Sequence, residues 1–344
     1  MSKEKQLLFP FAAIVGQEQM KAALLLNVAD PGVGGVLIKG EKGTAKSTTV
    51  RSLAQVLPEV EHVRGCAYHC DPRRRGGLCQ NCAEAAASGA ELERERSPMR
   101  VVELPLSATE DRIAGTLDIE HVLQTGKKKF EPGVLAQANG NLLYVDEVNL
   151  LEDHMVDLLL DAAAMGVNYV EREGISFEHP SRFILVGSMN PEEGDIRPQL
   201  LDRFGLCVEI RGERDLRTRA DIVERRLAFD ADPEGFTEAF ADETRRIRDS
   251  VLEARGILSR TSPDKETIAL ASHVALYFEM EGHRADITMV RAARAHAALD
   301  GREGADKEDI AAVAPMVLTH RIKRKPFEDS KFDIGELRIC LQDF

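Results

Sequence analysis

One ten-residue stretch, GEKGTAKSTT at residues 40–49, constrains the fold of this chain more than any other. The apolar run GGVLIKG at residues 34–40 leads into it and predicts a buried parallel strand. A helical pattern follows from Ser47 to Leu57, where Pro58 stops it. A strand, a glycine-bearing turn and a helix in this order are the context in which the pattern G-x-x-x-x-G-K-[ST] forms a phosphate-binding loop.

Gly40, Lys46 and Ser47 are in register with that pattern, but Ala45 stands where its second glycine belongs. Successive backbone N–H groups of such a loop wrap a phosphate, and the helix N-terminus adds its partial positive charge. Alanine still carries an N–H, so we expect it to be tolerated if its φ is negative. The sequence predicts a nucleotide site here, with a purely structural strand-to-helix turn as the alternative. The expected contacts are Gly40, Glu41, Lys42, Gly43, Thr44, Ala45, Lys46, Ser47 and Thr48.

Short apolar runs that predict further strands follow the loop. They span residues 101–105, 141–147, 182–190 and 206–210. Helical patterns separate several of them, for example Asp153 to Met165, which Gly166 ends. This alternation predicts an α/β sheet with helices on both faces. A β-hairpin is expected at residues 168–178, with its turn at Glu173-Gly174.

From about Gly235 onward the strand signal gives way to helical patterns. One long charged helix is expected from Thr237 to Arg255, and Ser262-Pro263 should open the next, with serine as its cap. Pro315 should kink or shorten the last of the helices that follow. The expected parts are a nucleotide-binding domain at residues 1–232, a linker helix at 233–258 and a helical bundle at 259–344.

Two carboxylates, Asp146 and Glu147, end the predicted strand in LLYVDE. Asp146 can hold Mg²⁺ through water while Ser47 ligates it directly. Glu147 can orient and deprotonate an attacking water, and Lys46 can neutralise charge on the β- and γ-phosphates. A solvated carboxylate pair is the alternative interpretation. The position of the pair after a phosphate-binding loop, at the end of an apolar strand, favours nucleotide hydrolysis.

Two more polar features follow the later strands. Asn190, in GSMNPEEG, could hold the same water or the γ-phosphate, although a turn residue before Pro191 is the alternative. The stretch RPQLLDRFG at residues 197–205 carries arginines just before the last strand. An arginine placed this way could reach a neighbouring subunit's nucleotide and stabilise the charge of the transition state.

Composition excludes several classes of function. A net charge of −13 argues against a general nucleic-acid binder, because phosphate backbones demand clustered cations. Trp is absent and aromatic residues make up 5% of the chain, which argues against base-stacking platforms. No apolar run approaches the ~18 residues of a membrane-spanning helix, and MSKEKQLLFPF has no export signal. We therefore expect a cytoplasmic protein that binds neither nucleic acid nor membrane.

Four of the six cysteines gather in CAYHCDPRRRGGLCQNC, with the spacing C-x₃-C-x₈-C-x₂-C: Cys66, Cys70, Cys79 and Cys82. In a reducing compartment such a group favours a metal over disulfides, and four thiolates suit a structural Zn²⁺. An iron–sulfur cluster, a redox pair or no metal are the alternatives, and His69 could replace one cysteine. We expect a cysteine-rich insertion near residues 64–84, and ordinary apolar positions for Cys207 and Cys340.

The motifs GEKGTAKS, LLYVDEVNLL, the asparagine of GSMNPEEG and RPQLLDRFG, in this order and spacing, resemble those of an AAA+ ATPase. More narrowly, the chain resembles subunit I of magnesium chelatase, because residues 9–27, 106–151 and 200–210 are very close to that subfamily's pattern. The resemblance spans essentially the whole chain. It implies a P-loop AAA+ αβα sandwich with a parallel sheet, followed by a C-terminal helical lid.

The resemblance also implies an activity. Such proteins bind ATP and Mg²⁺ between the subunits of a ring, usually a hexamer, and hydrolyse the ATP. They work with a larger AAA+ subunit and a porphyrin-binding catalytic subunit that inserts Mg²⁺ into protoporphyrin IX, a step of tetrapyrrole biosynthesis. Two alternatives remain at this point: the ATPase subunit of a cobalt chelatase in cobalamin synthesis, or an AAA+ protein remodeller.

Several residue roles come from the resemblance alone. Residues 14–17, with Val15 among them, would lie beside the adenine, and Asn190 would be the first sensor. Arg203 would be the finger that reaches the neighbouring subunit, positioned by Asp202. Arg284 is preferred to Arg291 as the sensor of the lid, because it opens its helix.

The resemblance also covers two insertions and one departure. The hairpin at residues 168–178 and the segment GKKKFEPG at residues 126–133 resemble insertions that mark this AAA+ branch, and we expect them to be coupling surfaces. The family's usual loop has glycine where Ala45 stands, which puts rate and affinity in question but not binding itself.

Overall fold

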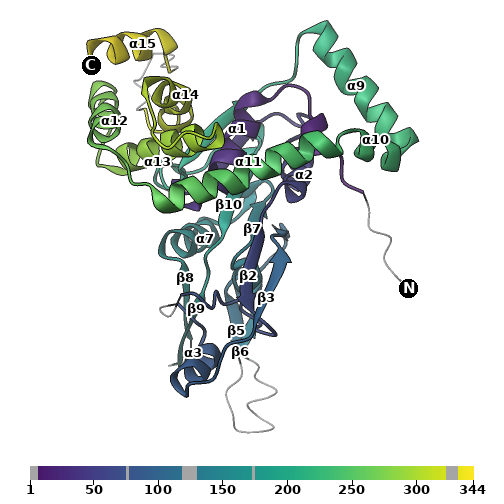
Figure 1. Cartoon of the computed structure of the whole chain (residues 1–344), viewed down its shortest axis with the longest axis vertical. Coiled ribbons are helices and arrows are strands. Elements are labelled where there is room, and N and C mark those ends of the chain that lie inside the picture. The colour runs from purple at the N-terminus through teal and green to yellow at the C-terminus, as the bar shows by residue number, and fades with distance from the viewer. Residues whose placement is uncertain (1–6, 75–76, 118–129, 173–174, 323–331) are drawn as a thin grey trace. The chain divides into compact units, whose positions relative to one another are not determined.

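A computed structural model describes residues 7–74, 77–117, 130–172, 175–322 and 332–344 of the chain (Figure 1). The chain divides into two compact units, each described by itself below. Unit 1 comprises residues 1–57, 190–192 and 201–344, and unit 2 comprises residues 58–189 and 193–200. The domain boundaries expected near residues 232 and 258 stay predictions.

A parallel sheet with the strand order β11-β1-β10-β7-β4 forms the core of the fold. In unit 1, β1 (Val36–Gly40) pairs with β11 (Leu206–Ile210). In unit 2, β10 (Ile184–Met189) and β4 (Val101–Leu104) both pair with β7 (Leu142–Val145). Strands β7 and β10 are buried along their whole length, which is why they appear in the sequence as unbroken apolar runs. The predicted α/β class with a parallel sheet is confirmed.

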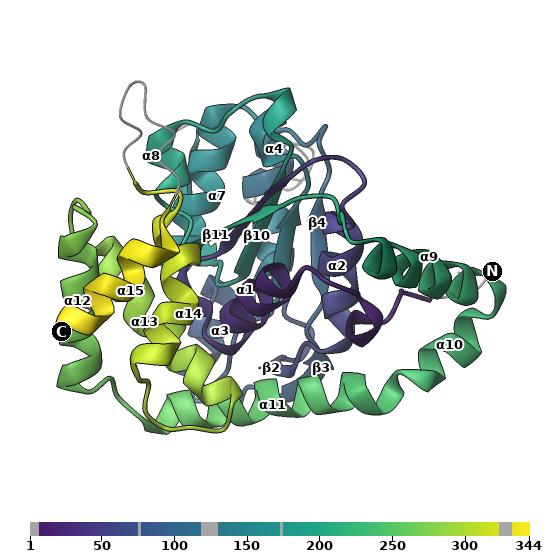
Figure 2. The same ribbon diagram turned by 90° about the horizontal axis from the view of Figure 1, so that it is seen from above.

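The remaining elements of unit 1 are helical. Helix α13 packs against α1, α11, α12 and α14, and Figure 2 shows α12 to α15 grouped together. Small buried side chains such as Ala292 and Ala293 let the neighbours of α13 approach closely. The predicted C-terminal helical bundle is confirmed. The elements are η1 (Phe11–Ala13), α1 (Glu18–Ala29), η2 (Pro31–Val33), α2 (Lys46–Ser52), η3 (Leu53–Gln55), α8 (Pro198–Leu201, ending in unit 1), α9 (Leu216–Ala231), α10 (Pro233–Ala239), α11 (Ala241–Arg260), α12 (Lys265–Tyr277), α13 (Arg284–Leu299), α14 (Lys307–Leu318) and α15 (Ile334–Asp343).

The single long helix expected from Thr237 to Arg255 is wrong. Two helices, α10 and α11, meet there at Phe240, whose φ of −103° and ψ of 7° interrupt the helical path. The Phe240 ring lies 5.0 Å from the Phe236 ring, which itself contacts Phe229 of α9. This aromatic packing breaks the helix at Phe240, although the sequence pattern of charged and apolar residues continues through it. Helix α9 was not predicted from the sequence.

The cap expected at Ser262 is also wrong. Helix α12 begins at Lys265, and the Asp264 carboxylate accepts a hydrogen bond of 2.7 Å from the Thr267 N–H. Aspartate followed three residues later by threonine gives a cap with both backbone and hydroxyl contacts, so it outcompetes the serine. Of the kink or shortening expected at Pro315, the shortening does not occur: helix α14 continues past the proline to Leu318, and the proline lies in its last turn.

Unit 2 adds three antiparallel strand pairs to its part of the sheet. The hairpin expected at residues 168–178 is confirmed as β8 and β9, and its expected turn at Glu173-Gly174 lies outside the described residues. Of the expected segment 126–133, Phe130–Pro132 form β6 and Gly133 precedes helix α6, whereas residues 126–129 lie outside the described residues. The elements are β2 (Glu59–Val63), α3 (Gln80–Ala87), β3 (Arg94–Pro98), α4 (Glu110–Ala114), β5 (Gly115–Leu117), β6 (Phe130–Pro132), α6 (Val134–Ala138), η4 (Val148–Leu150), α7 (Asp153–Met165), β8 (Val167–Arg172) and β9 (Ile175–Pro180), with η5 (Pro191–Glu193) shared between the units.

Within the described parts of the chain, no helix combines the length and the apolar character that crossing a membrane requires.

Candidate functional site

The loop between β1 and α2 has a glycine-like backbone at two positions. Gly43 has a φ of +81°, and Ala45, directly before the helix, has a φ of +61° and a ψ of 19°. The condition under which alanine was expected to be tolerated, a negative φ, is therefore not met. A left-handed conformation costs an L-residue about 1–2 kcal/mol. The loop keeps the path that a glycine would take, and Ala45 carries the strain.

The Lys46 ammonium lies over its own loop. Its Nζ is 2.5 Å from the carbonyl oxygen of Gly40 and 2.7 Å from that of Glu41. The Thr44 hydroxyl donates to the same Glu41 oxygen over 2.8 Å, which tightens the turn. Phosphate oxygens are also hydrogen-bond acceptors and carry more charge than carbonyl oxygens. An entering phosphate can therefore replace these carbonyls as the partner of the Lys46 ammonium. The donor set of the loop therefore fits a nucleotide.

In unit 2, two buried hydroxyls fix the carboxylate that ends β7. Asp146 Oδ1 accepts hydrogen bonds from Tyr144 Oη over 2.8 Å and from Ser188 Oγ over 2.5 Å. Tyr144 and Ser188 are 1% and 0% exposed. Sequence reasoning did not find these two residues. The only signal was a polar side chain inside each of two otherwise apolar strands.

Glu147 follows in a strained conformation. Its φ is +53° and its ψ is 51°, which glutamate rarely adopts, and its backbone N–H donates to Ser188 Oγ over 3.2 Å. Strain of this kind persists only where the surroundings enforce it, and it gathers at functional sites. Ser188 therefore holds both residues of the pair: it donates to Asp146 and accepts from Glu147.

Asn190, directly after β10, is 2% exposed, and its Oδ1 accepts from the Glu192 N–H over 3.3 Å. This contact is the turn-forming role that the sequence left open. A role of Asn190 as sensor stays a prediction.

The turn between α8 and β11 carries Arg203, and its neighbour Asp202 is held by the helical bundle of unit 1. Asp202 Oδ2 lies 2.5 Å from Arg284 Nη1, and Oδ1 lies 3.0 Å from Arg321 Nε. Arg291 instead donates to the Gly32 carbonyl oxygen. Of the two candidate lid sensors, it is therefore Arg284 that meets the residue beside the expected finger. Arg321 was not singled out from the sequence.

The segment expected beside the adenine, residues 14–17, is held by contacts within unit 1. Gln17 adopts a φ of +58° before α1, and Lys21 Nζ donates to the Ile14 carbonyl oxygen over 3.1 Å. Val15, which follows Ile14 in the chain, is half-buried. Its expected contact with adenine stays a prediction.

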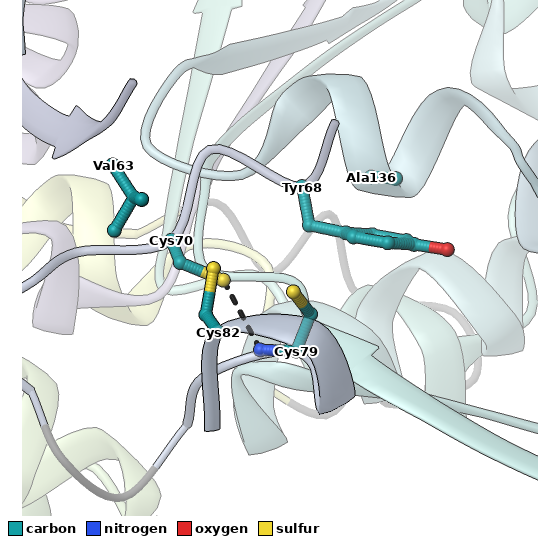
Figure 3. Close-up of a cluster of buried hydrophobic side chains, with 6 residues drawn as sticks. All are labelled: Val63, Tyr68, Cys70, Cys79, Cys82 and Ala136. Carbon is teal, nitrogen blue, oxygen red and sulfur yellow. Dashed lines mark hydrogen bonds between the residues drawn. The ribbon is translucent and has the colours of Figure 1, made fainter. Parts of the chain in front are cut away.

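In unit 2, four thiols converge. Among the described residues, one group of potential metal ligands is close enough to share an ion, with its ligand atoms all within 4.8 Å of one another: Cys66, Cys70, Cys79 and Cys82. The Cys66 sulfur lies 3.8 Å from that of Cys79 and 3.6 Å from that of Cys82, and all four are free thiols. Figure 3 shows the sulfurs of Cys70, Cys79 and Cys82 turned toward one another. His69 lies outside this group.

The thiols of the cluster affect one another's charge. Hydrogen bonds from the Cys70 and Cys79 thiols lower the pKa of Cys66, whereas burial raises the pKa of Cys82 to about 12. The Cys79 backbone N–H also donates to the Cys70 sulfur over 3.1 Å. On its own the cluster thus favours one thiolate, and a cation is needed before several thiolates can share so small a volume.

Packing ties the cysteine loop to the rest of unit 2. The amide of Asn139 donates to the carbonyl oxygens of Tyr68 over 2.7 Å and His69 over 3.1 Å, and its Oδ1 accepts from the Arg182 N–H over 2.9 Å. The Tyr68 ring lies 5.0 Å from the His179 ring of β9. The part of the loop between Cys66 and Cys70 is therefore also held by contacts that do not involve the thiols.

Known proteins resemble this chain over nearly its whole length. A family model described as magnesium chelatase, subunit ChlI, matches residues 118–200, and an AAA lid domain model matches residues 268–337. A magnesium-chelatase subunit ChlI homolog of Methanocaldococcus jannaschii is 49% identical over 339 residues, which cover 98% of this chain and 92% of that protein. The magnesium-chelatase 38 kDa subunit of Acidiphilium rubrum is 50% identical over 323 residues, or 94% and 93% of the two chains.

Two solved structures add to this. A putative ATPase from Cytophaga hutchinsonii has a TM-score of 0.62 over 97% of this chain and 91% of its own, but at 16% identity it shows the fold alone. A chain from the complex between subunits BchI and BchD of magnesium chelatase, based on a single-particle cryo-EM reconstruction, has a TM-score of 0.54 at 48% identity, over 93% of this chain and 98% of that chain. With half of all residues shared with curated subunits, and an AAA+ fold with its lid, this chain belongs to the magnesium-chelatase subunit ChlI family.

Proposed function

We propose that this chain is the ATP-hydrolysing motor subunit of a magnesium chelatase-type complex, at work in the cytoplasm. In this proposal it forms a ring, with six subunits as the expected number, alongside a larger AAA+ subunit. A porphyrin-binding partner inserts Mg²⁺ into protoporphyrin IX. The observation that carries the proposal is the Asp146–Glu147 pair, with its carboxylate fixed by two buried hydroxyls and its backbone strained.

The phosphate-binding loop and the Asp146–Glu147 pair have separate roles in the proposal. Loop N–H groups and the Lys46 ammonium would hold the β- and γ-phosphates. Ser47 directly and Asp146 through water would hold the Mg²⁺ that accompanies ATP. That Mg²⁺ neutralises charge on the phosphates. Glu147 takes a proton from the attacking water, and Asn190 holds the water or the γ-phosphate.

The remaining charge compensation comes from a neighbouring copy. Arg203 reaches the nucleotide of the next subunit as a finger, and Arg284 senses the nucleotide of its own subunit. Fingers of this kind raise hydrolysis by about 10³–10⁵-fold in other phosphate-transferring enzymes. Both arginines are linked to Asp202: Arg203 follows it in the sequence, and Arg284 contacts its carboxylate.

The test is a gentle affinity purification from the native cell with ATP and Mg²⁺ present, followed by mass spectrometry. We expect a second AAA+ subunit and a large porphyrin-binding subunit to co-elute, and the eluate to insert Mg²⁺ into protoporphyrin IX. An eluate that inserts cobalt instead would assign the chain to a cobalt chelatase. Recovery of this chain with unrelated client proteins would contradict the chelatase role and favour a remodeller.

The cysteine cluster supports a second and independent proposal, a structural Zn²⁺ site. Four sulfurs around Zn²⁺ at about 2.3 Å stand about 3.8 Å apart in a regular tetrahedron. The distances of 3.8 and 3.6 Å around Cys66 match that spacing. An iron–sulfur cluster places several atoms between its thiolates and so requires a wider separation, which makes a single ion the better fit.

Metal analysis of the purified chain tests the site. We expect one zinc per chain and no visible absorption band. Zinc should be lost in Cys82→Ser and kept in Cys340→Ser, a matched control because Cys340 is also buried but lies in α15. Iron and sulfide in stoichiometric amounts would replace zinc with a cluster, and a metal-free chain that keeps its fold would remove the site.

A further inference from the structure

The turn that carries Arg203 is held by one nearly buried guanidinium. Arg321 follows α14, and its side chain is only 5% exposed. Nε donates to the Asp202 carboxylate over 3.0 Å. The two terminal nitrogens donate to the carbonyl oxygens of Asp202 over 3.1 Å, Phe204 over 2.7 Å and Gly205 over 3.0 Å. Arg321 thus binds the turn around Arg203 both at its backbone carbonyl oxygens and at the Asp202 carboxylate.

Only arginine can make this set of contacts. Its guanidinium carries N–H donors on three nitrogens in a rigid plane, whereas a lysine has a single nitrogen on a flexible stem. Burial lowers the pKa of Arg321, and the Asp202 carboxylate acts against this shift, so the charge is retained next to its counterion. Loss of the side chain would leave the carbonyl oxygens of the turn without these donors.

His320 supports the same turn without adding charge. Its Nε2 lies 3.0 Å from the Phe204 carbonyl oxygen, and burial holds its pKa well below the usual value. A neutral ring with a proton on Nε2 donates to that oxygen. On the opposite side, the Gly205 N–H donates to the Gly34 carbonyl oxygen over 3.0 Å. A methyl group on Gly205 would come within 1.9 Å of the Val33 carbonyl oxygen, so the turn has no room to shift that way.

The second arginine on Asp202 differs from the first. The Arg284 side chain is 51% exposed and meets the carboxylate through one nitrogen, Nη1. The same Nη1 also donates to the Asp202 carbonyl oxygen over 3.4 Å. An exposed ion pair made through one nitrogen is worth little and is easily exchanged. The buried Arg321 side chain makes contacts through all three of its nitrogens, so it is not easily exchanged. Asp202 therefore has one fixed partner and one partner that is able to leave it.

We propose that Arg321 is a positioning residue for the finger that acts in trans. It clamps residues 202–205 to the end of α14, so that Arg203 points from a rigid base toward the neighbouring subunit. Arg284 is the exchangeable partner: when it leaves Asp202 for the nucleotide of its own subunit, the Arg321 contacts keep the turn in place. This inference rests on the proposed ATPase function and adds a residue to it.

The experiment uses complementation between two inactive variants of the full chain. Glu147→Gln cannot activate water but keeps its finger, and Arg203→Ala keeps its water-activating group but lacks a finger. Mixed in equal amounts with ATP and Mg²⁺, they should hydrolyse ATP, since the Glu147→Gln subunit supplies a finger to its neighbour. In this mixture the Glu147→Gln subunit contributes only that finger.

Adding Arg321→Gln to the Glu147→Gln subunit should lower the complemented rate at least about tenfold, a part of what a finger supplies. The nucleotide affinity of the double variant, measured with a fluorescent ATP analogue, should match that of Glu147→Gln alone. A merely structural role would lower both. Arg338→Gln, at an exposed arginine of α15, is the matched control and should leave the complemented rate unchanged.

If Arg321→Gln does not assemble, Arg321→Lys serves in its place, because it keeps the charge and most of the volume but not the planar set of donors. A full complemented rate with either variant would overturn the inference. Failure of the starting pair, Glu147→Gln with Arg203→Ala, would overturn the finger itself and with it the clamp. The two failures are therefore distinguishable.

Discussion

The nucleotide-binding residues and the cysteine cluster are both short motifs of this chain, but they differ in what completes them. Lys46 rests on the carbonyl oxygens of its own loop, and Arg284 is half exposed on Asp202. Both contacts can be exchanged for a nucleotide. The four thiols instead come from one stretch, three of them are buried, and a single ion would satisfy them all. The first site needs ATP and a neighbouring copy, whereas the second is complete within one subunit.

This difference separates rate from stability. Changes at the nucleotide site should alter turnover and leave the fold intact, because its groups are exchangeable and its scaffold is the sheet. Changes at the cysteine cluster should alter stability. We expect the effect of each substitution to follow that separation, with the greatest losses at Glu147 and Cys82.

Glu147→Gln should lower ATP hydrolysis by about 10²–10⁴-fold, the usual contribution of a general base, while ATP binding is kept. The measurement is steady-state phosphate release together with the affinity for a fluorescent ATP analogue. Glu152→Gln, at an exposed glutamate just before α7, is the matched control and should behave as the unaltered chain. Unaltered turnover in Glu147→Gln would remove Glu147 from the mechanism.

Cys82→Ser should destabilise unit 2 by more than about 4 kcal/mol, because loss of a metal site is among the few single changes with so large an effect. Urea unfolding followed by circular dichroism measures it, and removal of the ion by a chelator should reproduce it. If Cys82→Ser unfolds at the same urea concentration as Cys340→Ser, the cluster does not stabilise the fold, and the contrast between the two sites fails.

Ser188→Ala should reduce hydrolysis by about tenfold, equivalent to the loss of one charge-assisted hydrogen bond of about 1.4 kcal/mol. It removes the donor to Asp146 and the acceptor for the Glu147 N–H. The reduction should be accompanied by a higher Mg²⁺ requirement, measured by titrating Mg²⁺ at fixed ATP. Ser181→Ala, another fully buried serine of unit 2, provides the comparison and should leave the Mg²⁺ titration unchanged.

Ala45→Gly should stabilise the chain by about 0.5–1 kcal/mol. Glycine relieves the left-handed strain of about 1–2 kcal/mol, and its greater freedom in the unfolded chain cancels part of the gain. Thermal unfolding measures the shift. Ala54→Gly, in the short helix η3, removes no such strain and should be destabilising, so equal shifts of the same sign would contradict the assignment.

The sequence predicted best those features that depend on residues close together in the chain. The parallel strands, helix α7 with its end at Gly166, and the grouping of the four cysteines followed from burial runs, a left-handed glycine and ligand spacing. The break at Phe240 and the cap at Asp264 were missed because aromatic packing and a competing side chain decide them.

Within the candidate site, sequence reasoning found the charged groups but not the residues that hold them. Tyr144 and Ser188 lie in apolar strands, and Arg321 is far from Asp202 in the chain. Their roles depend on contacts across the fold, which periodicity and spacing do not encode. The strain at Ala45 was likewise hidden, since a residue type alone does not fix φ.

The most direct test of the account is a titration of normal subunits with Arg203→Ala subunits at constant total concentration, with ATP hydrolysis as the readout. If the finger acts on the neighbouring subunit of a coupled ring, activity should fall faster than the fraction of normal subunits. A linear fall, in which each Arg203→Ala subunit removes the turnover of one site only, would contradict the coupled ring.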